Sequence, residues 1–300
     1  MIKAEPFDYA RAFSRNIGWV TADEQARLRG ARVAIAGLGG VGGFHLLTLV
    51  RLGIGAFTLA ESDHFSLENF NRQVGASLPH LERSKLDVMI EMARAINPEL
   101  DVRRFPDGVV RDNVDDFLRD ANIYVDGLDF FAFAARSATF AGCARLGIPA
   151  ITAAPLGMGV AMLNFLPGRM TFEQYFGFEG KPDSERALRF LLGLSPAMLQ
   201  RRYLVDRSRV NFDEQRGPST VMACELCAGV AGTEALKILL GRGPALAAPW
   251  GLHFDAYRLR YRRTWRPWGY RNPLLLFARA IARSQLQHWQ GSERTPSKRA

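Results

Sequence analysis

Cysteine is scarce in this sequence: Cys143, Cys224 and Cys227 are the only cysteines among 300 residues. So few cysteines cannot supply a disulfide framework, and a reducing compartment is the expected setting for such a chain. Cys224 and Cys227 form one CxxC pair, whereas a structural zinc site needs four ligands. We therefore expect all three cysteines to pack inside helices, and zinc is not expected as a cofactor.

Long apolar runs are also absent. No stretch of the sequence is apolar over the roughly 20 residues that a membrane-spanning helix requires. The opening segment MIKAEPFDYARAF contains no apolar core of a secretory signal. We therefore expect a cytoplasmic protein without a transmembrane segment.

Negative charge is in deficit, since 39 Lys and Arg residues outnumber 30 Asp and Glu residues and the net charge is +9. The excess is concentrated near the end of the chain, where Tyr257–Arg271 interleaves arginines with aromatic residues. Such a segment can grip nucleic acid or an acidic partner surface. The alternative is a basic tail that folds over its own domain or a second subunit, with Trp and Tyr as packing anchors.

A glycine-rich turn stands between a buried strand and a helix. Residues 32–36 form a short β-branched run that is typical of a buried strand. Four glycines follow at once: Gly37, Gly39, Gly40 and Gly42. They allow a tight turn, and they let backbone N–H groups at the start of a helix over Val41–Leu52 approach a phosphate. A second strand, Ala56–Ala60, ends at Glu61, whose carboxylate can accept hydrogen bonds from ribose hydroxyls.

The loop after Glu61 distinguishes this site from that of a simple dehydrogenase. It carries polar candidates for the nucleotide site, followed by a lysine on the next helix: Asp63, Asn69, Arg72, Gln73 and Lys85. Two cations and two amides suit a triphosphate better than a nicotinamide, because Arg can clamp a phosphate with two hydrogen bonds and Lys supplies a point charge. The pattern predicts that Arg72 and Lys85 bind the phosphates of ATP.

Two carboxylates follow a third apolar run, Ile123–Val125. Asp126 ends this predicted strand, and Asp129 comes three residues later. Carboxylates at the ligand side of a parallel sheet are suited to holding Mg²⁺. We expect Asp129 to be the metal ligand and Asp126 to line the nucleotide site.

These motifs together resemble the ThiF/MoeB/HesA family of adenylating enzymes, which share their fold with ubiquitin-activating enzymes. The family pattern is a GxGGxG turn, an acidic strand end, an NxxRQ block, a lysine on the next helix and a late Asp. Upstream, Arg15 with Asn16 resembles a family segment whose arginine reaches the ATP of the neighbouring subunit, although Asn16 stands where the family has Gln. The resemblance covers roughly residues 10–256, and it implies ATP, Mg²⁺ and a homodimer in which Arg15 is catalytic.

The order of elements predicts an α/β protein with a Rossmann-like, mostly parallel sheet flanked by helices. We divide the chain into a helical arm (1–30), an adenylation domain (31–256) and a basic aromatic tail (257–300). Further helices are predicted over Glu82–Ile96, Val114–Arg119, Phe131–Leu146, Glu185–Leu192 and Ser219–Leu240. Residues 157–166 read as an antiparallel extension of the sheet, and 168–218 as the family's crossover over the active site.

The crossover contains no cysteine, although the family usually carries its catalytic cysteine there. The resemblance therefore implies an enzyme that stops at an acyl-adenylate, formed on the C-terminus of a peptide or ubiquitin-like protein. Three alternatives stay open. The carboxylate can belong to a modified tRNA, with the basic tail as support; the chain can be a non-catalytic nucleotide-binding scaffold; or it can be an NAD(P) oxidoreductase.

Overall fold

The computed structural model describes residues 6–210, 214 and 217–281. The end of the predicted tail (282–300) and part of the predicted crossover (211–213 and 215–216) lie outside the described residues. None of the helices within the described ranges is both long and apolar enough to cross a membrane.

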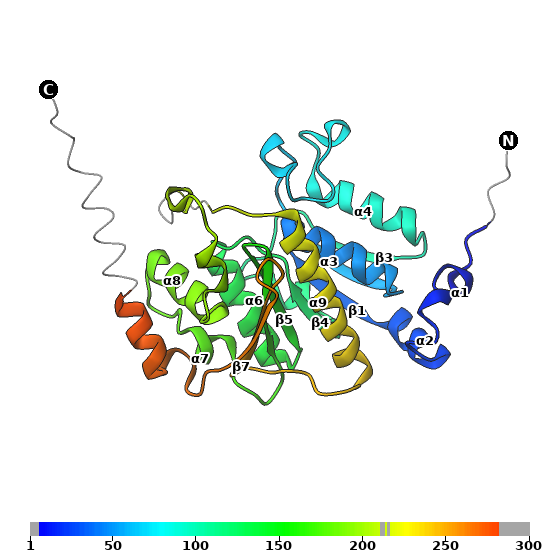
Figure 1. The fold of residues 1–300 in the computed structure, drawn as a ribbon. Coiled ribbons are helices and arrows are strands. Elements are labelled where there is room, and N and C mark those ends of the chain that lie inside the picture. The colour runs from blue at the N-terminus through cyan, green and yellow to red at the C-terminus, as the bar shows by residue number, and fades with distance from the viewer. Residues whose placement is uncertain (1–5, 211–213, 215–216, 282–300) are drawn as a thin grey trace, which may run out of the picture.

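One eight-stranded sheet organises the molecule, in the order β3-β2-β1-β4-β5-β6-β7-β8 (Figure 1). Its strands are β1 Arg32–Ala36, β2 Ala56–Ala60, β3 Asp101–Phe105, β4 Ile123–Asp126, β5 Ala150–Leu156, β6 Gly159–Phe165, β7 Trp250–Asp255 and β8 Arg260–Trp265. The first five strands pair in parallel, and β6, β7 and β8 add to β5 in antiparallel fashion. The predicted mostly parallel sheet with an antiparallel extension is confirmed.

Helices cover both faces of the sheet. They are α1 Tyr9–Ala12, α2 Ala22–Gly30, α3 Gly40–Arg51, α4 Lys85–Ile96, α5 Val114–Leu118, α6 Phe133–Leu146, α7 Phe172–Phe176, α8 Asp183–Leu194 and α9 Val221–Leu240. Buried apolar residues of α3, α4 and α9 form one core with the sheet, and those of α5 to α8 form another. Figure 1 shows α3 and α9 lying against each other.

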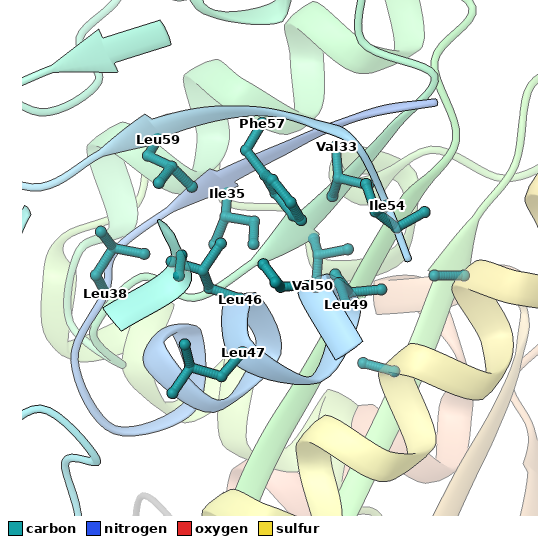
Figure 2. Packing of buried hydrophobic residues seen from close by; sticks show 14 of the residues in the cluster. Val33, Ile35, Leu38, Leu46, Leu47, Leu49, Val50, Ile54, Phe57 and Leu59 are labelled. Carbon is teal, nitrogen blue, oxygen red and sulfur yellow. The ribbon is translucent and has the colours of Figure 1, made fainter. Parts of the chain in front are cut away.

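The core around β1 explains why its sequence is apolar throughout. Val33 and Ile35 pair in register with Phe57 and Leu59 of β2 and pack with them against α3 (Figure 2). The alternate residues of β1, which are alanines, belong to the core on the opposite face. A parallel strand with a helix layer on each side is buried on both faces, so every residue of β1 is apolar except Arg32 at its start.

The strand order places a topological switch point between β1 and β4. The chain leaves β1 through α3 to reach β2 on one side, whereas β4 lies on the other side. Sheets of this kind open a crevice at the carboxyl ends of the strands that flank such a switch point. The glycine turn follows β1, and the segment with Asp126 and Asp129 follows β4, so both border this crevice.

The start of the predicted tail is part of the fold. β8 pairs with β7, and residues 273–281 are helical, with Leu275 buried against Leu188 and Leu192 of α8. The expectation that Trp and Tyr act as packing anchors is met in part. Trp265 packs against Trp250 and Tyr257 against Tyr203, although Tyr257, Trp265 and Trp268 stay 63%, 57% and 68% exposed.

Candidate active site

The glycine turn packs against the backbone that follows β4. Gly37 has a φ of +81°, in the left-handed region that favours glycine. A Cβ atom at Gly42 would lie 1.7 Å from the carbonyl oxygen of Gly37, and one at Gly127 would lie 2.3 Å from the same oxygen. Only glycines allow β1, α3 and the end of β4 to meet this closely. The N-terminus of α3, whose first N–H groups have no partner within the helix, therefore lies at the crevice.

Glu61 ties the end of β2 to this turn. One carboxylate oxygen accepts the backbone N–H of Leu38 at 2.8 Å, and the other accepts those of Ser62 and Asp63, both at 2.9 Å. A carboxylate offers about four lone pairs, so acceptor capacity remains after these three bonds. Glu61 is thus held rigidly beside the turn, where a ribose hydroxyl can still donate to it.

Arg72 and Gln73 lie directly over the glycine turn. A Cβ atom at Gly39 would lie 3.4 Å from Gln73 Nε2, and one at Gly40 would lie 3.9 Å from Arg72 Cγ. Asn69, which is buried, accepts the Ser66 N–H at 3.1 Å and so fixes the loop that presents both side chains. The predicted NxxRQ block and the predicted turn therefore meet in space.

The side chains of Arg72 and Gln73 both keep capacity for hydrogen bonds to a ligand. The Arg72 guanidinium donates to the main-chain oxygen of Glu68 at 2.7 Å and to Asn71 Oδ1 at 2.9 Å, and within the described ranges it meets no carboxylate. Gln73 is 8% exposed, and its Oε1 has no hydrogen-bond partner among the described residues. A buried polar atom without a partner costs about 1–3 kcal/mol, so a bound molecule or water that pairs with it stabilises the site.

Lys85 places a buried cation at the same crevice. Its Nζ donates to Asp63 Oδ2 at 3.1 Å, and its side chain is 7% exposed while that of Asp63 is 70% exposed. Lys85 is the first residue of α4, where the positive end of the helix dipole disfavours a cation. The lysine therefore does not stabilise α4 as a helix, whereas an anionic ligand beside it would be stabilised by both charges.

Asp126 is occupied by contacts within the protein. Its carboxylate accepts hydrogen bonds from Arg136 Nε at 2.8 Å, Thr152 Oγ1 at 2.9 Å and the Tyr124 hydroxyl at 3.2 Å. Asp126 and Arg136 side chains are each 2% exposed. The geometry favours a structural role for Asp126 over the expected contact with a nucleotide.

Arg136, which the sequence patterns did not single out, also holds the loop that carries Asp129. Its other two nitrogens donate to the carbonyl oxygens of Leu128, Asp129 and Phe130 at 2.8, 3.0 and 3.1 Å. The sequence offers one signal for this role of Arg136: it is an arginine in the first turn of the helix that follows Asp126. Such a signal is weak, because helix arginines are common and usually exposed.

Asp129 presents an exposed carboxylate at this loop. One of its oxygens accepts the Phe131 N–H at 3.0 Å, and the second has no partner among the described residues. Within the described ranges no three His, Cys, Asp or Glu side chains gather into a metal site. Asp129 nevertheless fits Mg²⁺, which is commonly held by one or two carboxylates together with substrate phosphates.

Arg15 lies away from these residues in its own chain. It belongs to a 3₁₀ turn whose neighbour Asn16 donates to the carbonyl oxygens of Arg51 and Leu52 at the C-terminal end of α3. The glycine turn is at the other end of α3, about 18 Å away for a helix of this length. Arg15 therefore does not reach the glycine turn of its own chain.

The cysteines are buried in helices, as expected. Cys224 nevertheless borders the turn, since a Cβ atom at Gly40 would lie 3.3 Å from its Sγ. Burial raises the pKa of Cys224, and it raises the pKa values of Cys143 and Cys227 as well. Neutral thiols are poor nucleophiles, so these cysteines are packing residues in this structure.

The strand order and the glycine turn at the crevice define a protein with a Rossmann-like fold, a class of fold in which nucleotides commonly bind at this position. The ThiF family model matches residues 13–274, and the chain therefore belongs to the ThiF family. A tRNA threonylcarbamoyladenosine dehydratase of Haemophilus influenzae is 36% identical over 133 residues, which cover 44% of this chain and 50% of that protein. The heterocyst HesA protein of Trichormus variabilis is 26% identical over 212 residues, covering 64% and 78%.

A solved structure of Escherichia coli MccB with ATP superposes on this chain with a TM-score of 0.63. The superposition covers 87% of this chain and 73% of MccB, at 19% identity, and it shows a shared fold. The match to the dehydratase spans only about half the length of that protein. Family membership and fold are thus established, while the particular reaction is a matter of proposal.

Proposed function

We propose that this protein is an ATP-dependent adenylyltransferase that activates a carboxylate as an acyl-adenylate. The observation that carries the proposal is the position of Arg72 and Gln73 over Gly39 and Gly40. The Arg72 guanidinium meets no carboxylate among the described residues and lies against the N-terminus of α3, so it is suited to a polyphosphate. Lys85 adds a second cation at the same crevice.

In the proposed reaction a carboxylate oxygen of the substrate attacks the α-phosphorus of ATP, and pyrophosphate leaves. Arg72 and Lys85 neutralise the charge that accumulates on the leaving phosphates, and the turn amides orient them. Glu61 accepts from the ribose and fixes the position of the α-phosphorus. Asp129 would hold Mg²⁺, which supplies further neutralisation of phosphate charge when bound.

No thiol of the chain takes part in this scheme. The pKa of Cys224, which lies nearest the turn, is raised by burial, so the thiolate needed for acyl transfer is disfavoured. The acyl-adenylate is then consumed by an external nucleophile or by a partner protein. We propose the C-terminus of a peptide or a ubiquitin-like protein as the carboxylate substrate.

A second candidate keeps the chemistry and changes the substrate. The tRNA threonylcarbamoyladenosine dehydratase of H. influenzae is 36% identical over 133 residues, whereas the HesA protein is 26% identical. By that likeness the carboxylate would belong to a modified nucleoside of tRNA. The arginines of β8 favour this candidate as well, because a basic surface attracts nucleic acid.

The proposal is tested by ATP–pyrophosphate exchange with three substrate pools: peptides with free C-termini, ubiquitin-like proteins, and tRNA that carries the carboxylated nucleoside. Exchange with either of the first two supports the peptide reading, and exchange with tRNA alone supports the second candidate. ATP binding without exchange in any pool would identify a nucleotide-binding scaffold. Binding of NAD in preference to ATP, measured by calorimetry, would contradict adenylation altogether.

A further inference from the structure

The strand β8 forms one edge of the sheet. It pairs with β7 on one side, and its other side has no strand partner in the ranges that the structure describes. All residues of Arg260–Trp265 are exposed except Thr264, which is half-buried. In an edge strand about half of the backbone N–H and C=O groups point outward and are free to pair with another strand.

The charge on this edge is of one sign. Residues 256–271 contain six arginines and neither Asp nor Glu. The register places Arg260 and Arg262 opposite Asp255 and His253, on one face of the sheet, and Arg263 opposite Leu252, on the other. Arg260 and Arg262 form no ion pair or hydrogen bond with any described side chain. A strand added to β8 would therefore meet arginines on both of its faces.

The aromatic residues of the hairpin are less suited to stacking nucleobases. The rings of Trp250 and Trp265 already lie against each other, with centroids 5.8 Å apart and planes at 28°. The Arg263 guanidinium sits 4.5 Å from the Trp250 centroid. Recognition of single-stranded nucleic acid relies on open aromatic faces, and Trp250 and Trp265 each have one face occupied by the other. The main-chain edge of β8 has no strand partner in the described ranges and is the more regular feature for a partner to bind.

A second copy of the chain is a poor partner for this edge. Pairing β8 with β8 would bring arginines of both copies together, and like charges directly opposite in a ladder are destabilising. Basic residues on an edge strand protect it against such self-association. The same residues would attract a strand of opposite charge, which an acidic polypeptide supplies.

We propose that the β8 edge binds an extended acidic segment of another polypeptide by strand addition. Main-chain hydrogen bonds to β8 provide the pairing, and Arg260, Arg262 and Arg263 select for Glu and Asp side chains. The inference does not depend on the proposed reaction, because the edge lies four strands away from β4 and binding requires no ATP.

The experiment measures fluorescence anisotropy of a labelled peptide of about 12 alternating Glu and Val residues, a length that spans a six-residue strand with overhang. The charge-reversal variant is Arg260→Glu/Arg262→Glu. Its matched control is Arg94→Glu/Arg119→Glu, which makes the same charge change at exposed positions on α4 and after α5. A peptide of the same sequence that is N-methylated at every backbone nitrogen keeps the charge and lacks the N–H groups for a ladder on either side.

The wild type and the matched control should bind the acidic peptide, and the reversal variant should bind at least about tenfold more weakly. Affinity should also fall as salt is raised from about 50 to 300 mM. Equal binding by the reversal variant would overturn the site, and equal binding of the N-methylated peptide would overturn strand addition. Tighter binding of single-stranded RNA, lost with the same reversal, would overturn the choice of partner. Circular dichroism and the midpoint of urea denaturation confirm that each variant is folded.

Discussion

Arg136 donates its Nε–H to Asp126 Oδ2 at 2.8 Å, and both side chains are 2% exposed. The remaining nitrogens of the guanidinium bind three carbonyl oxygens of the loop that carries Asp129. The buried ion pair thus connects the core beneath β4 to the carboxylate that borders the crevice. Loss of Arg136 would leave the Asp126 carboxylate buried without its cation, and it would also remove the three hydrogen bonds that hold the loop.

The first prediction concerns this pair. Arg136→Met should lower the free energy of unfolding by about 3–5 kcal/mol, because it leaves the Asp126 carboxylate buried without its cation. The double variant Arg136→Met/Asp126→Asn should recover part of that loss, since no uncompensated charge remains. Urea denaturation measures both. A double variant as unstable as the sum of the two single variants would show that the pair is not coupled.

Glu61→Ala should weaken ATP binding by about 1–3 kcal/mol, because it removes an acceptor for the ribose and leaves the Leu38 N–H without its partner. Isothermal calorimetry gives the affinity directly. Glu99→Ala, which breaks only an exposed ion pair with Arg29, is the control and should bind ATP as the wild type does. Unchanged ATP affinity in Glu61→Ala would contradict its assignment to the ribose.

Arg15 provides a test of the proposed homodimer. We expect Arg15→Ala and Asp129→Ala each to lose ATP–pyrophosphate exchange while remaining dimeric in sedimentation. Mixed and allowed to exchange subunits, the two variants should regain up to about a quarter of wild-type activity, since half of the dimers would then hold one intact site. A monomer at micromolar concentration, or full turnover by Arg15→Ala, would contradict a shared site.

A variant without cysteine tests whether the chemistry ends at the acyl-adenylate. Cys143→Ala/Cys224→Ser/Cys227→Ala should keep exchange with the true substrate, because burial disfavours the thiolates. It should lose about 1 kcal/mol of stability per buried site. A thioester or persulfide trapped on Cys224 by mass spectrometry would assign the protein to a covalent mechanism instead.

His45 predicts a dependence of stability on pH. Burial lowers its pKa to about 4, although the negative charge of Asp126 acts in the opposite direction, and neither ring nitrogen has a partner among the described residues. The unfolded chain binds a proton near pH 6.5 and the folded protein does not, so stability should fall as pH drops from about 6.5 to about 4.

The loss attributable to His45 should approach roughly 3 kcal/mol across that window, and His45→Leu should remove it. Chemical denaturation of both proteins at a series of pH values measures the difference. His253, whose pKa burial also lowers, contributes in the same direction and stays present in the variant. Parallel pH profiles for His45→Leu and wild type would contradict the assignment.

Local patterns predicted most of the elements that build the crevice. The strand, the glycine turn and the helix after it are specified by adjacent residues, so β1 and α3 lie within a residue of their predicted bounds. The helix predicted from Glu82 begins instead at Lys85, because Glu82 has a φ of +60° that no α-helix accepts. Such a conformation is imposed by the surrounding loop and leaves no mark on periodicity.

Features that depend on contacts between distant segments could not be predicted from the local sequence patterns. β3 was not identified, because an edge strand with the sequence DVRRF lacks the apolar run of a buried strand. The role of Arg136 was missed for a related reason, since its partners are a strand end and a loop. The sequence placed both Asp126 and Asp129 at the ligand side of the sheet, and the fold shows that Asp126 is buried and Asp129 is exposed.

The mutual contact of Gly37, Gly42 and Gly127 bears on how this site can be altered. No one of the three can gain a side chain without displacing backbone of another, so the turn behaves as a single unit with respect to substitution. Engineering of nucleotide preference therefore has to proceed through the neighbouring loop that holds Arg72 and Gln73, where side chains lie on the turn without being interlocked with it. The three glycines fix the backbone of the turn, and the side chains of the loop that packs on it are the positions where ligand selectivity can change.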